Sequence, residues 1–450
     1  MGSQESPLRI AIIGAGPVGL ALASTLVMNK SSTHCITLYE ATAELREVGA
    51  GITISGRTFA IARAIGLEDA FLGMDQYKDD PQDEVEYTYR KSDEPVGHPL
   101  GKASFGHAMF FHRAQFRDSL ASHVATFDQV ELKLGKRLQN VERVGEENHL
   151  SFADGTSAVA DVVIGADGFK SPMRHAMLRI AAEDLKQPSL NELAPAVFSG
   201  QWVYRATYPV NRLRETWQKF AGTDAGEHRV FKERLLLYSG EKNHIGAYLI
   251  ANRTLVNIGT FLSDVSRAGK VMPENEHVQA AVDISHIKKS FNDWEPEARA
   301  LIEAMNEASL WAINVVQSLP FFAHDRIAVL GDAAHAMTPH LGNGVNQGIE
   351  DAYVLGRVLN APGVNRSTVH LALQAYSKSR LPRAQAVAAA SMDMGRLMDW
   401  QYTFPGENNF NTDKTRQVGA IMEIINWVPK GDTEDEVKVA LDTFATTASL

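Results

Sequence analysis

Three short apolar runs, each closed by glycine, set the hydrophobic pattern of this chain. The runs are Leu8–Ile13, Val162–Ile164 and Arg326–Leu330, and their β-branched content predicts strands. A helical pattern follows the first run from Pro17, and another follows the third from about Asn346 to Val358. We therefore expect an α/β fold in which strands run into glycine turns and then into helices.

Between these runs the pattern changes to an alternation of apolar and polar positions. The alternation covers residues 84–91, 197–210, 234–250 and 254–261, with gaps of hairpin length. It predicts an antiparallel sheet inserted into the α/β part of the chain. Such a sheet would form one wall of a pocket at a domain boundary, where small-molecule sites are common.

The change of pattern predicts the domain organisation. Beyond about residue 365 we expect helices with an alanine-rich packing face, interrupted at Pro382. We predict three parts. Residues 1–75, 105–180 and 318–400 form a discontinuous α/β domain. Residues 76–104 and 181–317 form an inserted sheet domain, and residues 401–450 form a C-terminal helical tail.

Composition narrows the classes of function. The chain has 450 residues and a net charge of −10, which argues against a nucleic-acid-binding surface. Its one cysteine, Cys35, excludes an intramolecular disulfide and disfavours a cysteine-based metal site. Glycines interrupt the first apolar run, which suits neither a signal peptide nor a membrane span. We expect a cytoplasmic protein without a metal centre.

The first glycine turn has the spacing of a dinucleotide site. Gly14 permits a tight turn, Gly16 lets the backbone approach a pyrophosphate, and Gly19 lets the helix lie close to the strand. A second apolar strand ends at Glu40, where a carboxylate would bind the hydroxyls of a ribose and would repel a 2′-phosphate. This pattern favours FAD or NAD over NADP and leaves those two open.

The two later turns favour a flavin. The second turn carries Asp167 and Gly168, and the third carries Asp332. Gly342 and Gly344 then precede a helix whose first N–H groups and partial positive charge point into the loop. A reduced flavin carries negative charge at its ring and benefits from this arrangement, whereas NAD does not.

Two histidines lie near the third turn. Their spacing in a loop lacks the i, i+4 facing that lets a histidine pair on a helix hold a metal. We interpret His335 as a packing or hydrogen-bonding residue and leave His340 open as a contact on the substrate side.

The three turns, taken together and in this order, resemble the FAD-dependent aromatic hydroxylases, which are single-component flavoprotein monooxygenases. The resemblance covers roughly residues 8 to 400. Two further segments, Glu47–Ile52 and Phe111–Leu120, are similar to the salicylate hydroxylase group and its fungal relatives, including hydroxybenzoate 1-hydroxylases. The resemblance implies a Rossmann-like FAD-binding domain with an inserted antiparallel-sheet substrate domain and C-terminal helices.

The resemblance also implies roles for individual residues at the cofactor. Glu40 would hold the FAD ribose, Arg113 the linker region, and Asp332 the ribityl and pyrophosphate portion. The loop from Pro339 to Asn346 would line the isoalloxazine. The full set of cofactor residues expected from it is Gly14, Gly16, Gly19, Glu40, Gly51, Arg113, Asp167, Asp332, Pro339, Gly342, Gly344, Val345 and Asn346.

On the substrate side, the resemblance to fungal phenol hydroxylases assigns catalytic roles to Arg205 and Tyr238, which would bind and ionise a phenol. A cation within about 4 to 6 Å can lower such a pKa by roughly 1 to 3 units. Each residue also has a purely structural interpretation, as a strand ion pair for Arg205 and as an amphipathic strand residue for Tyr238.

The implied activity is hydroxylation of a small phenolic aromatic through a C4a-hydroperoxyflavin, with dioxygen and NADH or NADPH as transient co-substrate. We expect oxidative decarboxylation of a hydroxybenzoate to a dihydroxybenzene. Alternatives are ortho-hydroxylation or dearomatisation of a phenolic secondary metabolite, an FAD-dependent oxidase or dehydrogenase, and a nucleotide-binding regulatory protein without turnover. The sequence leaves a monomer or a homodimer open.

Two departures from the family pattern concern the flavin surroundings. Arg57 stands where a small or amide residue is usual, and Asn343 stands where glutamine is common. Both change side chains next to the predicted flavin.

Overall fold

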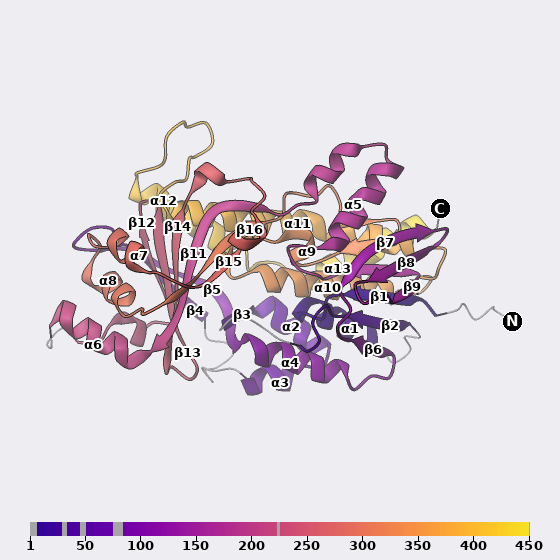
Figure 1. Cartoon of the computed structure of the whole chain (residues 1–450), viewed down its shortest axis with the longest axis horizontal. Coiled ribbons are helices and arrows are strands. Elements are labelled where there is room, and N and C mark those ends of the chain that lie inside the picture. The colour runs from indigo at the N-terminus through magenta and orange to yellow at the C-terminus, as the bar shows by residue number, and fades with distance from the viewer. Residues whose placement is uncertain (1–6, 29–33, 46–50, 75–83, 223–225, 450) are drawn as a thin grey trace.

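The computed structural model describes residues 7–28, 34–45, 51–74, 84–222 and 226–449. One half is built on a six-stranded sheet with the strand order β17-β18-β10-β1-β2-β6 (Figure 1). The strands are parallel except β17, which forms a short antiparallel pair with β18. Their bounds are β1 Arg9–Ile13, β2 Cys35–Tyr39, β6 Val130–Lys133, β10 Val162–Gly165, β17 Ala323–His324 and β18 Ile327–Val329.

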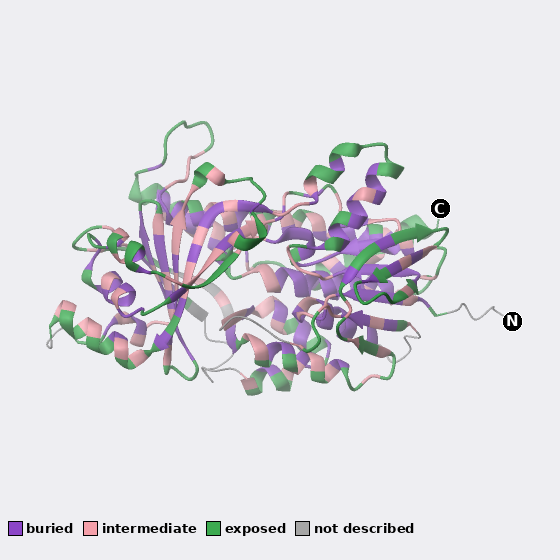
Figure 2. Ribbon diagram, in the orientation of Figure 1, coloured by how far each residue is buried: buried purple, intermediate pink, exposed green. Residues whose placement is uncertain are grey.

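Helices surround this sheet, and the buried strands form one apolar core with them (Figure 2). The predicted strands at 8–13, 162–164 and 326–330 are confirmed as β1, β10 and β18. A small sheet of β7 (Leu138–Val144), β8 (Glu147–Phe152) and β9 (Ser157–Ala160) lies beside them. The helices are α1 Pro17–Val27, α2 Gly56–Ala64, α3 Glu68–Met74, α4 Arg113–Val124, α5 Pro172–Asp184, α9 Asp332–His335 and α10 Gly344–Leu359, with 3-10 turns η1 Pro188–Leu193 and η5 Pro339–Leu341.

The other half is a nine-stranded sheet with the order β15-β16-β11-β14-β13-β12-β4-β5-β3. The predicted alternating segments are confirmed as strands, and the segment 234–250 is a hairpin of two. The bounds are β3 Gly51–Ser55, β4 Glu84–Lys91, β5 His98–His112, β11 Val197–Pro209, β12 Leu235–Gly240, β13 Asn243–Ile250, β14 Leu255–Ser263, β15 Val278–Val282 and β16 Ala308–Val315.

The large sheet has two different faces. One face packs an apolar core that includes helices α6 (Val210–Ala221), α7 (Ser285–Ser290) and α8 (Pro296–Glu303), which lie on the outer side in Figure 1. Strand β5 is fifteen residues long, pairs with β4 and β3, and runs directly into α4. The backbone therefore connects the two halves through this strand. The opposite face, called the free face below, packs in part against α11 and α12 through residues that include Tyr87, Tyr89 and Leu237. The remainder of this face is the candidate wall of the site.

Three helices complete the chain: α11 Val369–Met398, α12 Lys414–Trp427 and α13 Thr433–Ala448. The predicted interruption at Pro382 is wrong. Helix α11 is thirty residues long and continues through Pro382. A proline inside a helix removes one backbone hydrogen bond and normally kinks or ends it. Here Arg380 and Arg383, on either side of the proline, bind groups of α10, α13 and the segment after α12, which holds the helix in place.

These side chains form part of a buried ionic network that links α2, α10, α11 and α13. Arg57 pairs with Glu350 at 3.0 Å and with Glu436 at 2.8 Å. Arg380, which is fully buried, pairs with Asp351 at 2.8 Å, with Glu350 at 3.1 Å and also with Glu436. Glu350 and Glu436 each pair with more than one arginine, so loss of one charged side chain would leave unequal numbers of positive and negative charges in this network.

In the part of the chain that the structure describes, no helix is both long and apolar enough to cross a bilayer.

Candidate active site

The three glycine turns meet at one edge of the six-stranded sheet, because β1, β10 and β18 are adjacent parallel strands. Gly14, after β1, has φ +104°, a conformation that favours glycine. A Cβ atom at Gly14 would lie 2.4 Å from the carbonyl oxygen of Ala166, which follows β10. The first and second turns are therefore in backbone contact.

The glycines of the first turn divide into two kinds. A Cβ at Gly19 would lie 2.0 Å from the carbonyl oxygen of Gly14, so the protein itself requires a glycine there. A Cβ at Gly16 would meet no described protein atom within 4 Å. The space beside Gly16 is thus available to a ligand, which fits the predicted approach of a pyrophosphate.

The third turn is held against α1 in the same way. Gly331 has φ +59°, and a Cβ at Gly348 would lie 2.5 Å from Val18 on α1 and 3.1 Å from the Gly331 Cα. Asp332 is exposed, and its Oδ1 would be 3.7 Å from a Cβ on Gly344, the first residue of α10. The carboxylate therefore lies at the opening beside the start of this helix, as its predicted cofactor role requires.

Glu40 already holds the first turn. Its Oε2 accepts a hydrogen bond from the Ala15 N–H at 3.1 Å, and its Oε1 accepts from the N–H and hydroxyl of Thr42 at 2.9 and 2.8 Å. A carboxylate oxygen can accept more than one hydrogen bond, so a ribose diol could still bind there. The side chain thus orders the turn before any nucleotide arrives.

The second turn is fixed by two charged residues. Asp167 accepts hydrogen bonds from the Ser171 hydroxyl at 2.5 Å and the Met173 N–H at 3.0 Å, and burial raises its pKa to about 6. Arg174, which the sequence analysis missed, is fully buried and donates to the carbonyls of Phe169, Ala194 and Ala333 at 2.6 to 2.8 Å. Since Ala333 belongs to α9, Arg174 ties the second turn to the third.

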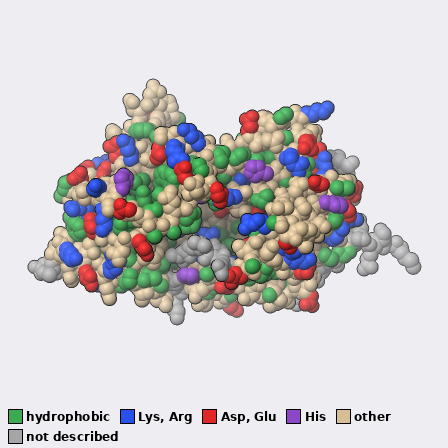
Figure 3. Space-filling model, viewed as in Figure 1, with side chains coloured by type: hydrophobic (Ala, Val, Ile, Leu, Met, Phe, Trp, Pro, Cys, Tyr) green, Lys and Arg blue, Asp and Glu red, His purple; other side chains and the backbone are tan. Residues whose placement is uncertain are grey.

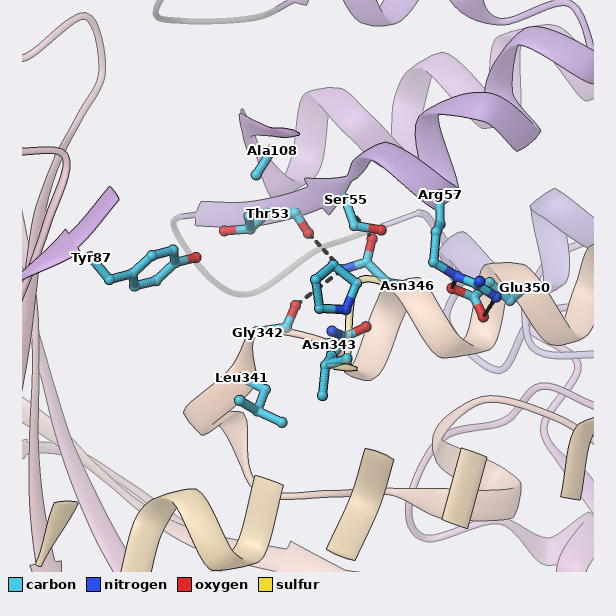
Figure 4. Close-up of a pocket in the computed structure, with 12 residues that line it drawn as sticks. Thr53, Ser55, Arg57, Tyr87, Ala108, Leu341, Gly342, Asn343, Asn346 and Glu350 are labelled. Carbon is cyan, nitrogen blue, oxygen red and sulfur yellow. Dashed lines mark hydrogen bonds and ion pairs between the residues drawn. The ribbon is translucent and has the colours of Figure 1, made fainter. Parts of the chain in front are cut away.

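The loop before α10 forms one side of a pocket (Figure 4). Gly342 has φ +59°, and the first N–H groups of α10, including those of Gly344 and Val345, lack helical partners. The side chain of Asn346 donates to the carbonyls of Thr53 and Gly342 and accepts from the Ser55 N–H. Its amide is therefore used to position this loop, and a contact with the isoalloxazine would involve its backbone.

Arg57 also lines this pocket, but its side chain is only 8% exposed and is paired with Glu350 and Glu436. The positive charge that replaces the usual small or amide residue is thus neutralised by Glu350, which also lines the pocket, and by Glu436. This pairing explains how the chain accommodates an arginine next to the predicted flavin loop. Pro339, at the start of η5, is exposed on the same loop.

Arg205 lies on the free face of the large sheet, because its neighbours Tyr204 and Ala206 pack into the covered core. The surface is hollowed between the two halves of the molecule (Figure 3). The strand register places Arg205 opposite Gly259 on β14, and Gly259 opposite Gly246 on β13. The side chains of Phe261 and Leu237 pack over these two glycines. The guanidinium lies over the Trp311 ring, with 5.7 Å between Cζ and the ring centroid, and burial lowers its pKa.

Tyr248 on β13 shares this face and was missed by the sequence analysis. Its hydroxyl would be 2.9 Å from a Cβ on Gly51, and its interaction with Arg205 acts to raise the arginine pKa. Arg113, at the start of α4, acts in the opposite direction on the same pKa. The structure therefore brings Gly51, Arg113, Arg205 and Tyr248 together in one region.

Tyr238 is not part of this region. It pairs with Ile245, so its side chain points to the face covered by α6, α7 and α8, where it is completely buried. Burial raises its pKa well above the ordinary value, and Glu295 and Glu297 raise it further. The catalytic role predicted for Tyr238 is therefore not supported, and Tyr248 is the tyrosine that lies beside Arg205.

His335 and His340 have different surroundings. His335 is buried and its Nε2 lies 2.5 Å from Asp351, which agrees with a hydrogen-bonding role. His340, on η5, contacts the rings of His244 and Phe261 on the free face of the large sheet. Among the described residues, no group of three or more histidine, cysteine, aspartate and glutamate side chains is arranged to hold a metal ion.

Comparison with known proteins gives consistent results. A family model described as an FAD binding domain matches residues 8–192 and 258–391. Salicylate hydroxylase of Pseudomonas putida is 32% identical over 416 residues, covering 91% of this chain and 90% of that protein. The 6-methylsalicylate 1-monooxygenase of Aspergillus terreus is 30% identical over 398 residues, covering 86% and 82%.

Solved structures of similar proteins have the same fold as this chain. A salicylate hydroxylase substrate complex superposes with a TM-score of 0.81 at 27% identity, covering 97% of this chain and 98% of that one. Klebsiella pneumoniae HpxO, complexed with FAD and uric acid, superposes with a TM-score of 0.65 at 19% identity, covering 98% and 97%, and shares the fold.

The two glycines of the first turn give opposite predictions. Gly16→Ala should leave the free energy of unfolding of the FAD-free protein within about 0.5 kcal/mol of wild type, and it should weaken FAD binding at least tenfold because the methyl group occupies ligand space. Gly19→Ala should destabilise the protein itself. Urea unfolding and fluorescence titration with FAD measure the two effects. Equal effects of the two variants on folding would contradict the assignment.

Asp167 predicts a pH dependence of stability. Its pKa in the folded state, about 6, exceeds the ordinary 3.8, so its contribution to stability is present below pH 3.8 and is lost as pH rises through 6. Between pH 4.5 and 7.5, the unfolding free energy of Asp167→Asn should therefore gain about 2 kcal/mol relative to wild type. Urea unfolding at both pH values measures this difference. The exposed Asp435→Asn serves as control and should show no gain.

Proposed function

The chain belongs to the FAD-dependent aromatic hydroxylases of the salicylate hydroxylase type, and we propose that its substrate is a small hydroxybenzoate that it converts to a dihydroxybenzene with loss of carbon dioxide. As a member of this family it is an FAD-dependent aromatic monooxygenase that uses NAD(P)H as co-substrate. This membership excludes the oxidase, dehydrogenase and regulatory alternatives.

The observation that carries the proposal is the state of Arg205. Within the described part of the chain, no carboxylate forms an ion pair with its guanidinium, and the residue is half-buried. Partial removal from water lowers its pKa, so the charged form is disfavoured at this position. An anionic substrate would supply the missing charge.

The chemistry explains why this charge is useful. FAD, reduced by NAD(P)H, supplies with dioxygen an electrophilic oxygen atom, so an electron-rich ring reacts faster. Arg205 can bind a carboxylate through two hydrogen bonds, or it can stabilise a phenolate and lower the pKa of the phenol by roughly 1 to 3 units. The ring of Trp311 packs against the guanidinium, and Tyr248 lies close enough to interact with it electrostatically.

Decarboxylation follows from where the oxygen atom is added. If the attacked carbon bears the carboxylate, the new C–O bond replaces the C–C bond to that group, and carbon dioxide leaves. Relatives named for salicylate and 6-methylsalicylate support a ring that carries both a hydroxyl and a carboxylate.

The test uses salicylate labelled in the ring carboxyl group, with 4-hydroxybenzoate as a second substrate. We expect labelled carbon dioxide in proportion to NAD(P)H oxidised, with one atom of labelled dioxygen in the product. A hydroxylated product that keeps its carboxyl label would contradict the decarboxylation. The absence of turnover with any hydroxybenzoate would contradict the proposed substrate class.

Arg205→Met should lower kcat/KM for the hydroxybenzoate at least a hundredfold, because the neutral side chain leaves the substrate anion unpaired, and it should increase the NAD(P)H oxidised per product formed. The melting temperature should stay the same or rise, since a buried charge has been removed. Arg214→Met, on the exposed side of α6, is the matched control and should leave both values unchanged. A similar loss in both variants would contradict the role of Arg205.

A further inference from the structure

Asp399 is a buried carboxylate at the end of α11, and it has no role in the reaction proposed above. It is completely buried and accepts hydrogen bonds from His244 Nδ1 at 2.6 Å, Gln201 Nε2 at 2.7 Å and the Ser263 hydroxyl at 2.5 Å. These three partners come from strands β13, β11 and β14 of the large sheet. One carboxylate thus organises a polar cluster at the edge of the free face.

The hydrogen bonds of this cluster have defined directions. An ionised carboxylate can only accept, so Gln201 must donate its amide N–H to Asp399. Its carbonyl Oε1 then faces His340 Nε2 at 2.6 Å and must accept the next hydrogen bond. A neutral His340 therefore carries its proton on Nε2, and its Nδ1 has a free lone pair.

The position of His340 is equally restricted. A Cβ at Gly395 of α11 would lie 2.4 Å from the His340 ring, so only a glycine allows the ring to occupy this place. His244 stacks on Phe261 with 4.2 Å between ring centroids, and the two rings contact His340 at 4.9 and 5.0 Å. In the part of the chain that the structure describes, no residue forms a hydrogen bond with His340 Nδ1.

We propose that Gln201 and Asp399 are positioning residues that hold His340 as the Nε2–H tautomer, so that its Nδ1 accepts a hydrogen bond from the ring hydroxyl of the substrate. This inference deepens the proposed function and depends on it for the identity of the substrate. The protein would thereby distinguish a free hydroxyl group from an ether at the same ring position.

The electrostatics favour hydrogen bonding over proton removal. Burial, together with His244, lowers the pKa of His340 well below 6.5. The other groups around the ring are the anion Asp399, reached through Gln201, and the neutral Ser263 and Phe261. A phenol has a pKa near 10, so proton transfer to His340 would be unfavourable by a factor of more than about a thousand. In this arrangement the hydroxyl keeps its proton while it donates to His340, and Arg205 binds the carboxylate.

Gln201→Lys reverses the direction of the hydrogen bonds. The ammonium group can pair with Asp399 but can only donate to His340 Nε2, which forces the proton of His340 onto Nδ1. A ring hydroxyl would still be able to accept from this N–H, but its own proton would lose its acceptor. An ether oxygen, which can only accept, would become the better partner.

The experiment measures binding of salicylate and 2-methoxybenzoate to the FAD-loaded enzyme by calorimetry. Wild type should prefer salicylate at least tenfold, and Gln201→Lys should reduce this preference at least tenfold. Because both probes carry a carboxylate, the added charge affects them alike. Gln201→Met, which removes the link without adding a donor, should bring the preference toward parity. Asp393→Asn, on α11 beside Arg396, should leave it unchanged.

Nitrogen-15 NMR of histidine-labelled protein gives an independent measurement, with the His340 signals identified by their loss in His340→Gln. Wild type should show a protonated Nε2 and an unprotonated Nδ1, and Gln201→Lys should show the reverse. A protonated Nδ1 in wild type, or an unchanged preference in Gln201→Lys, would overturn the inference. If neither acid binds, the proposed substrate class fails, while the NMR result still decides the tautomer.

Discussion

The site depends on the contact between backbone turns at the carboxyl edge of three adjacent parallel strands. β1, β10 and β18 end side by side, so their turns meet although they are separated by about 150 residues each in sequence. The close approach of Gly14 to Ala166, and of Gly348 to Gly331 and Val18, leaves no space for larger side chains. The nucleotide cleft is therefore fixed by backbone packing, and the polar side chains add specificity to a shape that already exists.

The large sheet contributes the chemistry of the substrate through one of its faces. Its covered face is a conventional apolar core, whereas its free face holds Arg205, Tyr248, His244 and Phe261. Gly246 and Gly259 are paired on this face, and the side chains of Leu237 and Phe261 pack over them. Arg205 and the hydrogen-bonding cluster around His340 give this face two chemically distinct parts. A ring that bears an anion and a hydroxyl group matches this arrangement.

Much of this architecture can be predicted from the sequence, because turn glycines and alternating strands are local signals. The face of a strand is harder to predict. The segment around Tyr238 is apolar at consecutive positions, so the alternation does not show which side chains face the helices, and only the pairing of Tyr238 with Ile245 decides it. Arg174 and Asp399 were missed for another reason: their partners lie up to 159 and 198 residues away, on elements that only tertiary packing brings together. The continuous helix through Pro382 likewise depends on partners outside it.

The ionic network has a consequence for how this chain can change. Arg57, near the start of the chain, and Glu436, near its end, share charges with Glu350 and Arg380 in between. A change at one of these positions alone would unbalance the buried charges, so we expect these positions to change together. We expect sequences that restore a small residue at position 57 to have altered the C-terminal helix as well, and chimaeras that exchange only one of these segments with a relative to fold poorly.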